Sequence, residues 1–286
     1  VRNMNMDRIA DSSNNGSAMR SIFMFLTVLL LAALASAADE SAVPSAALIL
    51  LDDKQTAEVR NSAIEANADH AGALIAEMAR GLGDDAAEEY RRIPWIWRVA
   101  VAAGKRNNAD QLRGVLEQSL PVEAGKLRDW QAVVIGGGVI NGITLAGEWP
   151  GPRIEKIIGD NESLKRRWAT ALDKSAALAD DEQVNRGTRY DALRMIALLG
   201  WDASGPKLRN YLRKGTHPEL QMGAVSGCGD IDDPRAAKAL LEALPTLDAK
   251  NIRLAVNAMK RTAERKQLLE DAVADGRISA ELLNAK

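Results

Sequence analysis

The residue types that most often do chemistry are few in this chain and lie far apart in the sequence. Neither histidine, His70 or His217, has a second histidine or a carboxylate at the spacing that zinc sites use. The single cysteine, Cys228, lies between two glycines without a neighbouring histidine that could activate it, so we expect a small buried hydrophobic residue. One cysteine also excludes an internal disulfide and a C-x-x-C-H haem attachment site. We therefore predict no catalytic residue, no metal ligand and no cofactor.

A short acidic run resembles the beginning of a calcium-binding loop. Asp230, Asp232 and Asp233 supply oxygen atoms, but the fifth position of such a loop would be Pro234 and the twelfth Leu241, and neither side chain can bind calcium. Aspartate followed by proline is typical of a helix N-terminus, where the carboxylate caps free backbone N–H groups. The sequence therefore predicts an N-capping turn at this place.

A glycine-rich segment, residues 132–141, resembles the first strand and phosphate-binding turn of a dinucleotide-binding fold. That motif needs a third glycine, so that the following helix can pack closely on the strand, and here the third position is Asn141. No alternation of strands and helices follows. We expect a glycine-rich helix or helix kink that packs closely against its neighbours. A phosphate-binding loop is the alternative, because the run Val-Val-Ile before the glycines would also suit a strand.

Tryptophan is the most informative residue type, with six tryptophans beside three tyrosines. Its large apolar ring and single N–H donor suit both interfaces and sugar-stacking surfaces, although wedging between helices is the more ordinary role. Trp95 and Trp97 are two positions apart, so on a helix they point in different directions. With the nearby arginines they mark a candidate interaction surface, which consists of Arg91, Arg92, Trp95, Trp97, Arg98 and Trp130.

The elements that would position these residues follow from a repeat in the second half of the chain. Ala192, Ala224 and Ala255 recur at a spacing of roughly 32 residues, and each lies in an apolar helix that is followed by a polar turn and a second helix. A fixed period of this length is typical of stacked helical repeats, none of which can bury its apolar face alone. Proline and glycine mark the turns, and Ile93-Pro94 is expected to end one helix before Trp95 begins the next.

The composition agrees with an all-helical chain. Of 286 residues, 47% are hydrophobic but only 4% aromatic, which suits close packing of alanine- and leucine-rich helices. We predict an all-α fold, a right-handed α-solenoid (α-α superhelix) of HEAT-like antiparallel helix pairs. It would span residues 55–286 after a lead-in at 38–54, with an irregular unit around 150–186. The net charge of −2 gives no argument for nucleic acid as a partner.

The N-terminal part reads as a targeting segment. Residues 1–18 form a polar extension, and a basic residue, an apolar run and a small-residue cleavage pattern then begin at Met19 and end at Ala37. We predict a signal peptide, export to the periplasm or the extracellular space, and no membrane span in the mature chain. We expect translation to start at Met19 and cleavage to follow Ala37, and an uncleaved anchor is the alternative.

Three stretches resemble one known family. They are Ile93-Pro-Trp-Ile-Trp-Arg with the residues up to 104, Arg128-Asp-Trp-Gln-Ala-Val-Val with the residues up to 138, and residues 251–278. They look like the HEAT-like helical-repeat region of large secreted planctomycete-type haem-binding, dehydrogenase-like proteins. In that family a sugar-dehydrogenase-like propeller precedes the repeats and a c-type haem domain follows them. This chain has neither propeller strands nor the haem motif, so no catalytic or haem-binding residue can be carried over.

These observations favour an exported, non-catalytic scaffold that binds other proteins. The resemblance implies an alternative, an accessory module that docks a propeller-type dehydrogenase or a c-type haem protein. A third possibility is an enzyme that acts on a sugar or a flavin-type ligand, close to Trp95 and Arg98 or to Gly136 and Gly138. A patch of tryptophan and arginine would favour binding, whereas a deep pocket with converging carboxylates would favour an enzyme.

Overall fold

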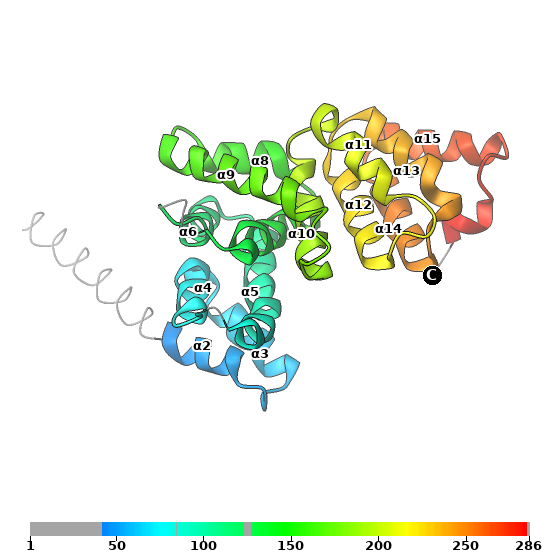
Figure 1. Cartoon of the computed structure of the whole chain (residues 1–286). Coiled ribbons are helices and arrows are strands. Elements are labelled where there is room, and N and C mark those ends of the chain that lie inside the picture. The colour runs from blue at the N-terminus through cyan, green and yellow to red at the C-terminus, as the bar shows by residue number, and fades with distance from the viewer. Residues whose placement is uncertain (1–41, 84, 123–126, 285–286) are drawn as a thin grey trace, which may run out of the picture.

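The chain folds into helices throughout the part that the structure describes. The computed structural model describes residues 42–83, 85–122 and 127–284, which contain fourteen α-helices and no strand (Figure 1). The α-helices are α2 (Val43–Leu51), α3 (Ala57–Ala66), α4 (Ala71–Ala79), α5 (Ala86–Arg106), α6 (Ala109–Ser119), α7 (Gly136–Leu145), α8 (Pro150–Ile158), α9 (Glu162–Leu178), α10 (Arg186–Ala197), α11 (Trp201–Tyr211), α12 (Pro218–Asp230), α13 (Pro234–Ala243), α14 (Ala249–Met259) and α15 (Ala263–Ala274). The predicted all-α class is confirmed.

The six helices expected from the alanine spacing are all present, as α10 to α15. The three alanines that set the spacing, Ala192, Ala224 and Ala255, are fully buried in α10, α12 and α14. α12 packs between α10 and α14, while α13 contacts both α11 and α15. Figure 1 shows these helices side by side in the C-terminal part of the molecule. Small residues at these positions let neighbouring helices approach closely.

The N-terminal helices continue this pattern of contacts between alternate helices. α4 packs against both α2 and α6, and α5 packs along α7, which in turn contacts α10. α2 lies within the segment expected to be a lead-in, although it packs against α3, α4 and α5. In Figure 1 the N-terminal helices are turned away from the row formed by α11 to α15, and α10 lies between the two groups. α8 and α9 occupy the region predicted to be irregular.

The helix ends follow ordinary capping chemistry. The Asp233 carboxylate accepts a hydrogen bond from the Arg235 backbone N–H at 2.7 Å, with Pro234 at the first position of α13. The predicted N-cap is therefore confirmed for Asp233, whereas Asp230 of the same run is the last residue of α12 and pairs with Arg194. Glycine also marks a turn, as expected: Gly200 lies between α10 and α11 with φ +81°, a conformation that glycine adopts without strain.

Pro94 does not end a helix, contrary to the sequence-based expectation. It lies inside α5, which runs without interruption from Ala86 to Arg106. A proline within a helix removes one N–H donor and crowds the carbonyl four residues earlier, here that of Tyr90. Both side chains are on the exposed side of α5, where water can hydrogen bond to that carbonyl. The prediction was wrong because tertiary packing along the opposite side of α5 holds the helix together.

The glycine-rich segment is helical, as the favoured interpretation predicted. A π-helical turn, Gln131–Ile135, leads directly into α7, and Gly136, Gly137 and Gly138 are all buried. A Cβ atom at Gly142 would lie 2.3 Å from the Val101 carbonyl oxygen, and one at Gly104 would lie 2.5 Å from that of Val139. Helices α5 and α7 therefore touch backbone to backbone, which only glycine permits at these positions.

Two further predictions concern membranes and export. Among the described residues no single helix is long and apolar enough to cross a membrane. One pair, Gln131–Leu145 with Pro150–Ile158, has sufficient length and apolar character together but is bent by 116°. The predicted signal segment between Met19 and Ala37 lies outside the described residues.

Candidate functional site

A groove of about 980 Å³ opens between helices in the described part of the chain. Four stretches of chain that are far apart in the sequence build it, and we call it the α5–α10 groove. Its walls come from the first half of α5, residues 129–134, residues 183–191 at the start of α10, and Glu219 with Met222 on α12. Four aromatic side chains line it, Tyr90, Trp97, Trp130 and Tyr190, together with four carboxylates, Glu89, Asp129, Asp191 and Glu219.

One hydrogen bond joins the two sides of the groove. The indole Nε1 of Trp97 on α5 donates to Oδ1 of Asp191 on α10 at 3.1 Å. The Asp191 carboxylate fits because Gly137 of α7 faces it, and a Cβ atom there would lie 2.4 Å from Oδ1. Three helices therefore meet at one carboxylate, which is 5% exposed.

The electrostatic environment of Asp191 opposes its ionisation. Burial is the largest effect and raises the pKa of Asp191 well above its ordinary value, and the negative charge of Glu219 adds to the increase. The positive charge of Arg194 and the hydrogen bond from Trp97 act in the opposite direction. Carboxyl groups with strongly shifted pKa values occur often at functional sites. Asp191 is the residue of the groove that most needs an explanation.

A buried ion pair lies next to the groove and has a different character. Both guanidinium atoms Nε and Nη2 of Arg194 donate to Oδ2 of Asp230, at 2.9 and 2.7 Å. Arg194 also donates to Asn141 at 2.6 Å, and the Thr144 hydroxyl donates to Asp230 at 2.6 Å. Burial disfavours the charged form, but the Asp230 carboxylate raises the pKa of Arg194 above its ordinary value. These groups satisfy one another across α7, α10 and α12.

The structure brings together only half of the predicted interaction surface. Trp97, Arg98 and Trp130 line the α5–α10 groove, whereas Arg91, Arg92 and Trp95 do not. Of the two tryptophans two positions apart, Trp97 alone faces the groove, which agrees with the expectation that they point in different directions.

The other three residues have partners within the fold. Arg91 and Arg92 both pair with Glu88, at 2.8 and 2.9 Å, and lower the pKa of that carboxyl to about 2. Arg91 also donates to the backbone of Leu51, and Arg92 to the carbonyl oxygens of Met78 and Arg80. These arginines connect α5 to the ends of α2 and α4.

Trp95 takes part in two cation–π contacts. The guanidinium groups of Arg60 and Arg98 each lie 4.5 Å from the centroid of its ring. Arg98 therefore stands at the edge of the groove with its charge directed to Trp95. Arg60 and Arg98 therefore both pack against the ring of Trp95.

Neither Cys228 nor His217 is part of the groove lining. Cys228 is fully buried in α12, as predicted, and burial raises the pKa of its thiol to about 12. His217 caps α12, where its Nδ1 accepts a hydrogen bond from the Glu219 backbone N–H at 3.3 Å. In the described part of the chain no group of three or more histidine, cysteine or acidic side chains could hold a metal ion.

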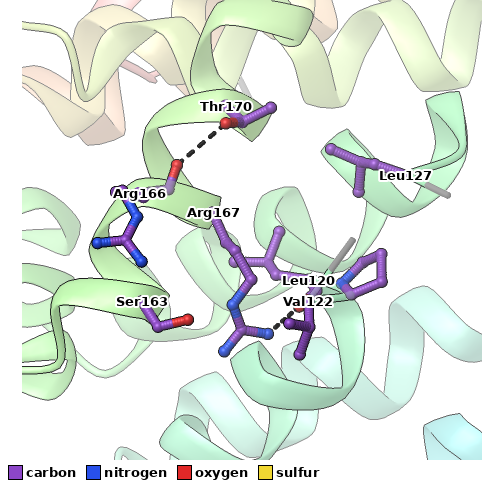
Figure 2. A pocket seen from close by; sticks show the side chains of 8 residues that line it. Leu120, Val122, Leu127, Ser163, Arg166, Arg167 and Thr170 are labelled. Carbon is purple, nitrogen blue, oxygen red and sulfur yellow. Dashed lines mark hydrogen bonds between the residues drawn. The ribbon is translucent and has the colours of Figure 1, made fainter. Parts of the chain in front are cut away.

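A second hollow, of about 310 Å³, lies between the end of α6 and α9 (Figure 2). Two hydrogen bonds lie in it: Arg167 donates to the Leu120 carbonyl oxygen, and the Thr170 hydroxyl donates to that of Arg166 at 3.0 Å. It is smaller than the α5–α10 groove and borders residues 123–126, which are outside the described ranges. We therefore take the α5–α10 groove as the candidate site.

Sequence reasoning missed the acidic residues of the groove, above all Asp191. One signal could have indicated it. Asp191 precedes the buried Ala192, and the equivalent positions before Ala224 and Ala255 hold Gly223 and Leu254. A charged residue where α12 and α14 have a small or apolar one before the buried alanine indicates either a buried pair or a site.

Comparisons of this chain with protein-family models, with curated proteins and with solved structures gave no match.

Proposed function

We propose that this chain is an exported, non-catalytic scaffold that binds a segment of a partner protein in the α5–α10 groove. Its helices would form HEAT-like antiparallel pairs in a right-handed solenoid. The contacts of α12 with α10 and α14, and of α13 with α11 and α15, support such a stack. Stacked helix pairs offer long continuous surfaces, which proteins of this architecture use for binding.

The groove itself is the observation that carries this proposal. Aromatic residues and methionine are enriched where proteins bind one another, and the groove contains four aromatic side chains and Met222. Tyr90 is 72% exposed at its edge, whereas Trp130 is 2% exposed. This gradient from a buried interior to an accessible rim resembles the organisation of protein interfaces.

A sugar-binding enzyme is a weaker explanation of the same groove. Stacking of a sugar needs an accessible ring face, and Trp130 is almost fully covered. The one thiol of the chain, Cys228, is not part of the groove, and its raised pKa keeps it protonated at neutral pH. The lining suits an extended peptide better. Such a peptide inserts single side chains into deep parts of a groove and hydrogen bonds to polar groups along its walls.

The resemblance to secreted haem-binding proteins suggests candidates for the partner. As an alternative to a general scaffold, we propose an accessory module that docks a separate propeller-type dehydrogenase or c-type haem protein. Both proposals share the groove as the docking surface and the predicted export. They differ in the partner, which cross-linking can identify.

A photo-cross-linking amino acid at position 90 tests the proposal in the native host. The control carries the same amino acid at Leu48, which is 73% exposed and therefore as accessible as Tyr90, but is not part of the groove lining. We expect one dominant cross-linked protein from position 90 that is missing from position 48. Mass spectrometry of the cross-linked peptide then identifies both the partner and its bound segment.

Equal capture from both positions, or none from position 90, would contradict the proposal. Recovery of a haem or propeller protein would favour the accessory module, and another exported protein would favour the general scaffold.

A further inference from the structure

Asp191 is a buried carboxylate without an ion pair among the residues that the structure describes. One donor, the Trp97 indole, hydrogen bonds to it. Arg194 is the basic residue whose charge acts on Asp191, but its guanidinium is held by Asp230 and Asn141. The positive charge that would ordinarily accompany a buried carboxylate is therefore committed elsewhere.

This arrangement is costly for the fold. An ionised carboxylate can accept several hydrogen bonds, and burial with a single indole donor leaves most of that capacity unused. The raised pKa of Asp191 reflects this cost. Gly223 and Leu254 at the equivalent positions of the next repeats show that the helix stack does not require an acid there. A ligand that brings its own donors would explain Asp191.

The surroundings select the charge of that ligand. Glu219 also lines the groove, and its negative charge acts on Asp191, whereas the one guanidinium in the lining is that of Arg98. Asp129 is already paired with Lys174 at 2.7 Å, and Arg98 stacks on Trp95. The remaining charge around Asp191 favours a cation, and aromatic rings such as those of Trp97 and Tyr190 also attract cations.

We propose that the α5–α10 groove recognises a basic side chain, lysine or arginine, on the bound segment of the partner protein, with its cationic head paired to Asp191. This inference rests on the proposed function of the groove as a docking surface. The methylene groups of such a side chain would pack against the apolar lining, which includes Ile93, Val134 and Met222. The basic residue would supply the hydrogen-bond donors that Asp191 lacks among the described residues.

Trp130 gives a second, independent indication of a polar ligand. Its ring lines the groove and is 2% exposed, and its Nε1 has no hydrogen-bond partner among the described residues. Buried indole N–H groups usually find an acceptor. A backbone carbonyl of the bound segment can provide one, so that the same peptide satisfies a donor and an acceptor of the groove.

A displayed library of random short peptides, selected on the full chain, tests this inference. Peptides that cross-link through position 90 are kept, sequenced and synthesised. We expect a shared lysine or arginine, and at least about a thirtyfold loss of affinity for Asp191→Asn, the size expected for one partner of a buried charge pair. The control is Asp129→Asn, which removes a groove carboxylate that Lys174 already pairs, and should change the affinity by less than about threefold.

A double-mutant cycle connects the two charges. Replacing the basic residue of the peptide by glutamine should weaken binding to the unmodified chain about as much as Asp191→Asn does, and the combination should add little. Circular dichroism checks that each variant remains helical. Peptides that cross-link through position 90 without a basic residue, or that bind Asp191→Asn equally well, would overturn this inference and leave the docking function standing. If no peptide cross-links through position 90, both proposals are overturned.

Discussion

At the scale of single residues, two buried acids show opposite uses of charge. The Asp230 carboxylate accepts hydrogen bonds from Arg194 and Thr144, both within the fold. Asp191, on the neighbouring helix α10, accepts one hydrogen bond, from Trp97. A buried ion pair with all its hydrogen bonds formed fixes the relative positions of its helices. A buried carboxylate with unused acceptor capacity instead favours binding of a ligand that supplies donors. Substitutions at the two sites should therefore change stability in opposite directions.

Arg194→Met should destabilise the protein by about 3–5 kcal/mol, because it leaves the Asp230 carboxylate buried without its main partner. Urea unfolding followed by circular dichroism measures the change. The matched control is Glu270→Gln, which breaks an exposed pair with Lys266 and should leave the midpoint nearly unchanged. Similar midpoints for both variants would show that Arg194 and Asp230 do not form the pair described here.

Asp191→Asn should stabilise the protein increasingly as the pH rises. The folded-state pKa of Asp191 is raised, so the native state binds this proton more tightly than the unfolded state does. Stability is then highest below the unfolded pKa and is lost as the pH rises through the folded pKa, at about 1.4 kcal/mol for each pH unit between the two pKa values. The asparagine keeps an acceptor for Trp97 but carries no charge.

Thermal unfolding of both proteins from about pH 4 to about pH 8 measures the difference. The charged or titratable groups that act on Asp191 are Arg194 of the same helix and Glu219 of α12, and both are present in the two proteins. A variant that is less stable than the unmodified chain at the upper end would mean that Asp191 contributes to the fold in its ionised form.

At the scale of helices, the contact between α5 and α7 depends on glycine. Gly142→Ala should destabilise the protein by about 1–3 kcal/mol, because the added methyl group would meet the backbone of Val101 and Gly104, which cannot move as a side chain would. Gly114→Ala is the control. Gly114 lies within α6 with no atom within 4 Å of an added Cβ, so helix propensity should stabilise that variant by up to about 1 kcal/mol. Denaturant midpoints of the two variants should move to opposite sides of the unmodified chain.

The helices were largely predictable from the sequence because their signals are local. Buried alanines, capping residues such as Asp233 and glycine turns such as Gly200 each depend on a few neighbouring residues. The failure at Pro94 has the opposite origin. The packing of α5 against α7 decides whether that helix continues, and Gly138 and Gly142, which permit the close contact, lie far from Pro94 in the sequence.

Residue types indicated some of the side chains that line the groove, but not which residues those side chains contact. Trp97, Arg98 and Trp130 were expected at a surface from their composition, and they do line the groove. Arg91 and Arg92 look the same in sequence, but Glu88, three and four positions earlier, engages both. The role of Asp191 depends on Trp97 and Gly137, which come from two other helices and which no short motif connects to it.

At the scale of the whole molecule, one arginine connects distant parts of the chain. Arg261, just after α14, donates to the carbonyl oxygen of Gly229 at 3.0 Å and to that of Glu148, which is 113 residues away. Its guanidinium also lies 3.9 Å from the centroid of the Trp149 ring. The turn after α7 is therefore attached to the C-terminal helices, in addition to the contacts that α10 makes with α7 and α12. We expect α7, α10 and α12, which these contacts join, to be the most stable part of the described chain.

Hydrogen exchange measured by mass spectrometry should reveal this order. Helices at the ends of a stack have a neighbour on one side only, so α15 should exchange early, whereas α7, α10 and α12 should exchange last. Cys228 in α12 provides a second probe, because its buried thiol should react with alkylating reagents only when the helices around α12 separate. Arg194→Met should speed both exchange in these three helices and labelling of Cys228, while leaving the early exchange of α15 unchanged.

Uniform exchange over all helices would instead indicate a single cooperative unit and would argue against a stack of separable repeats. If Cys228 reacts at the rate of α15 exchange, the centre and the end of the array open together, with the same consequence for the proposed solenoid.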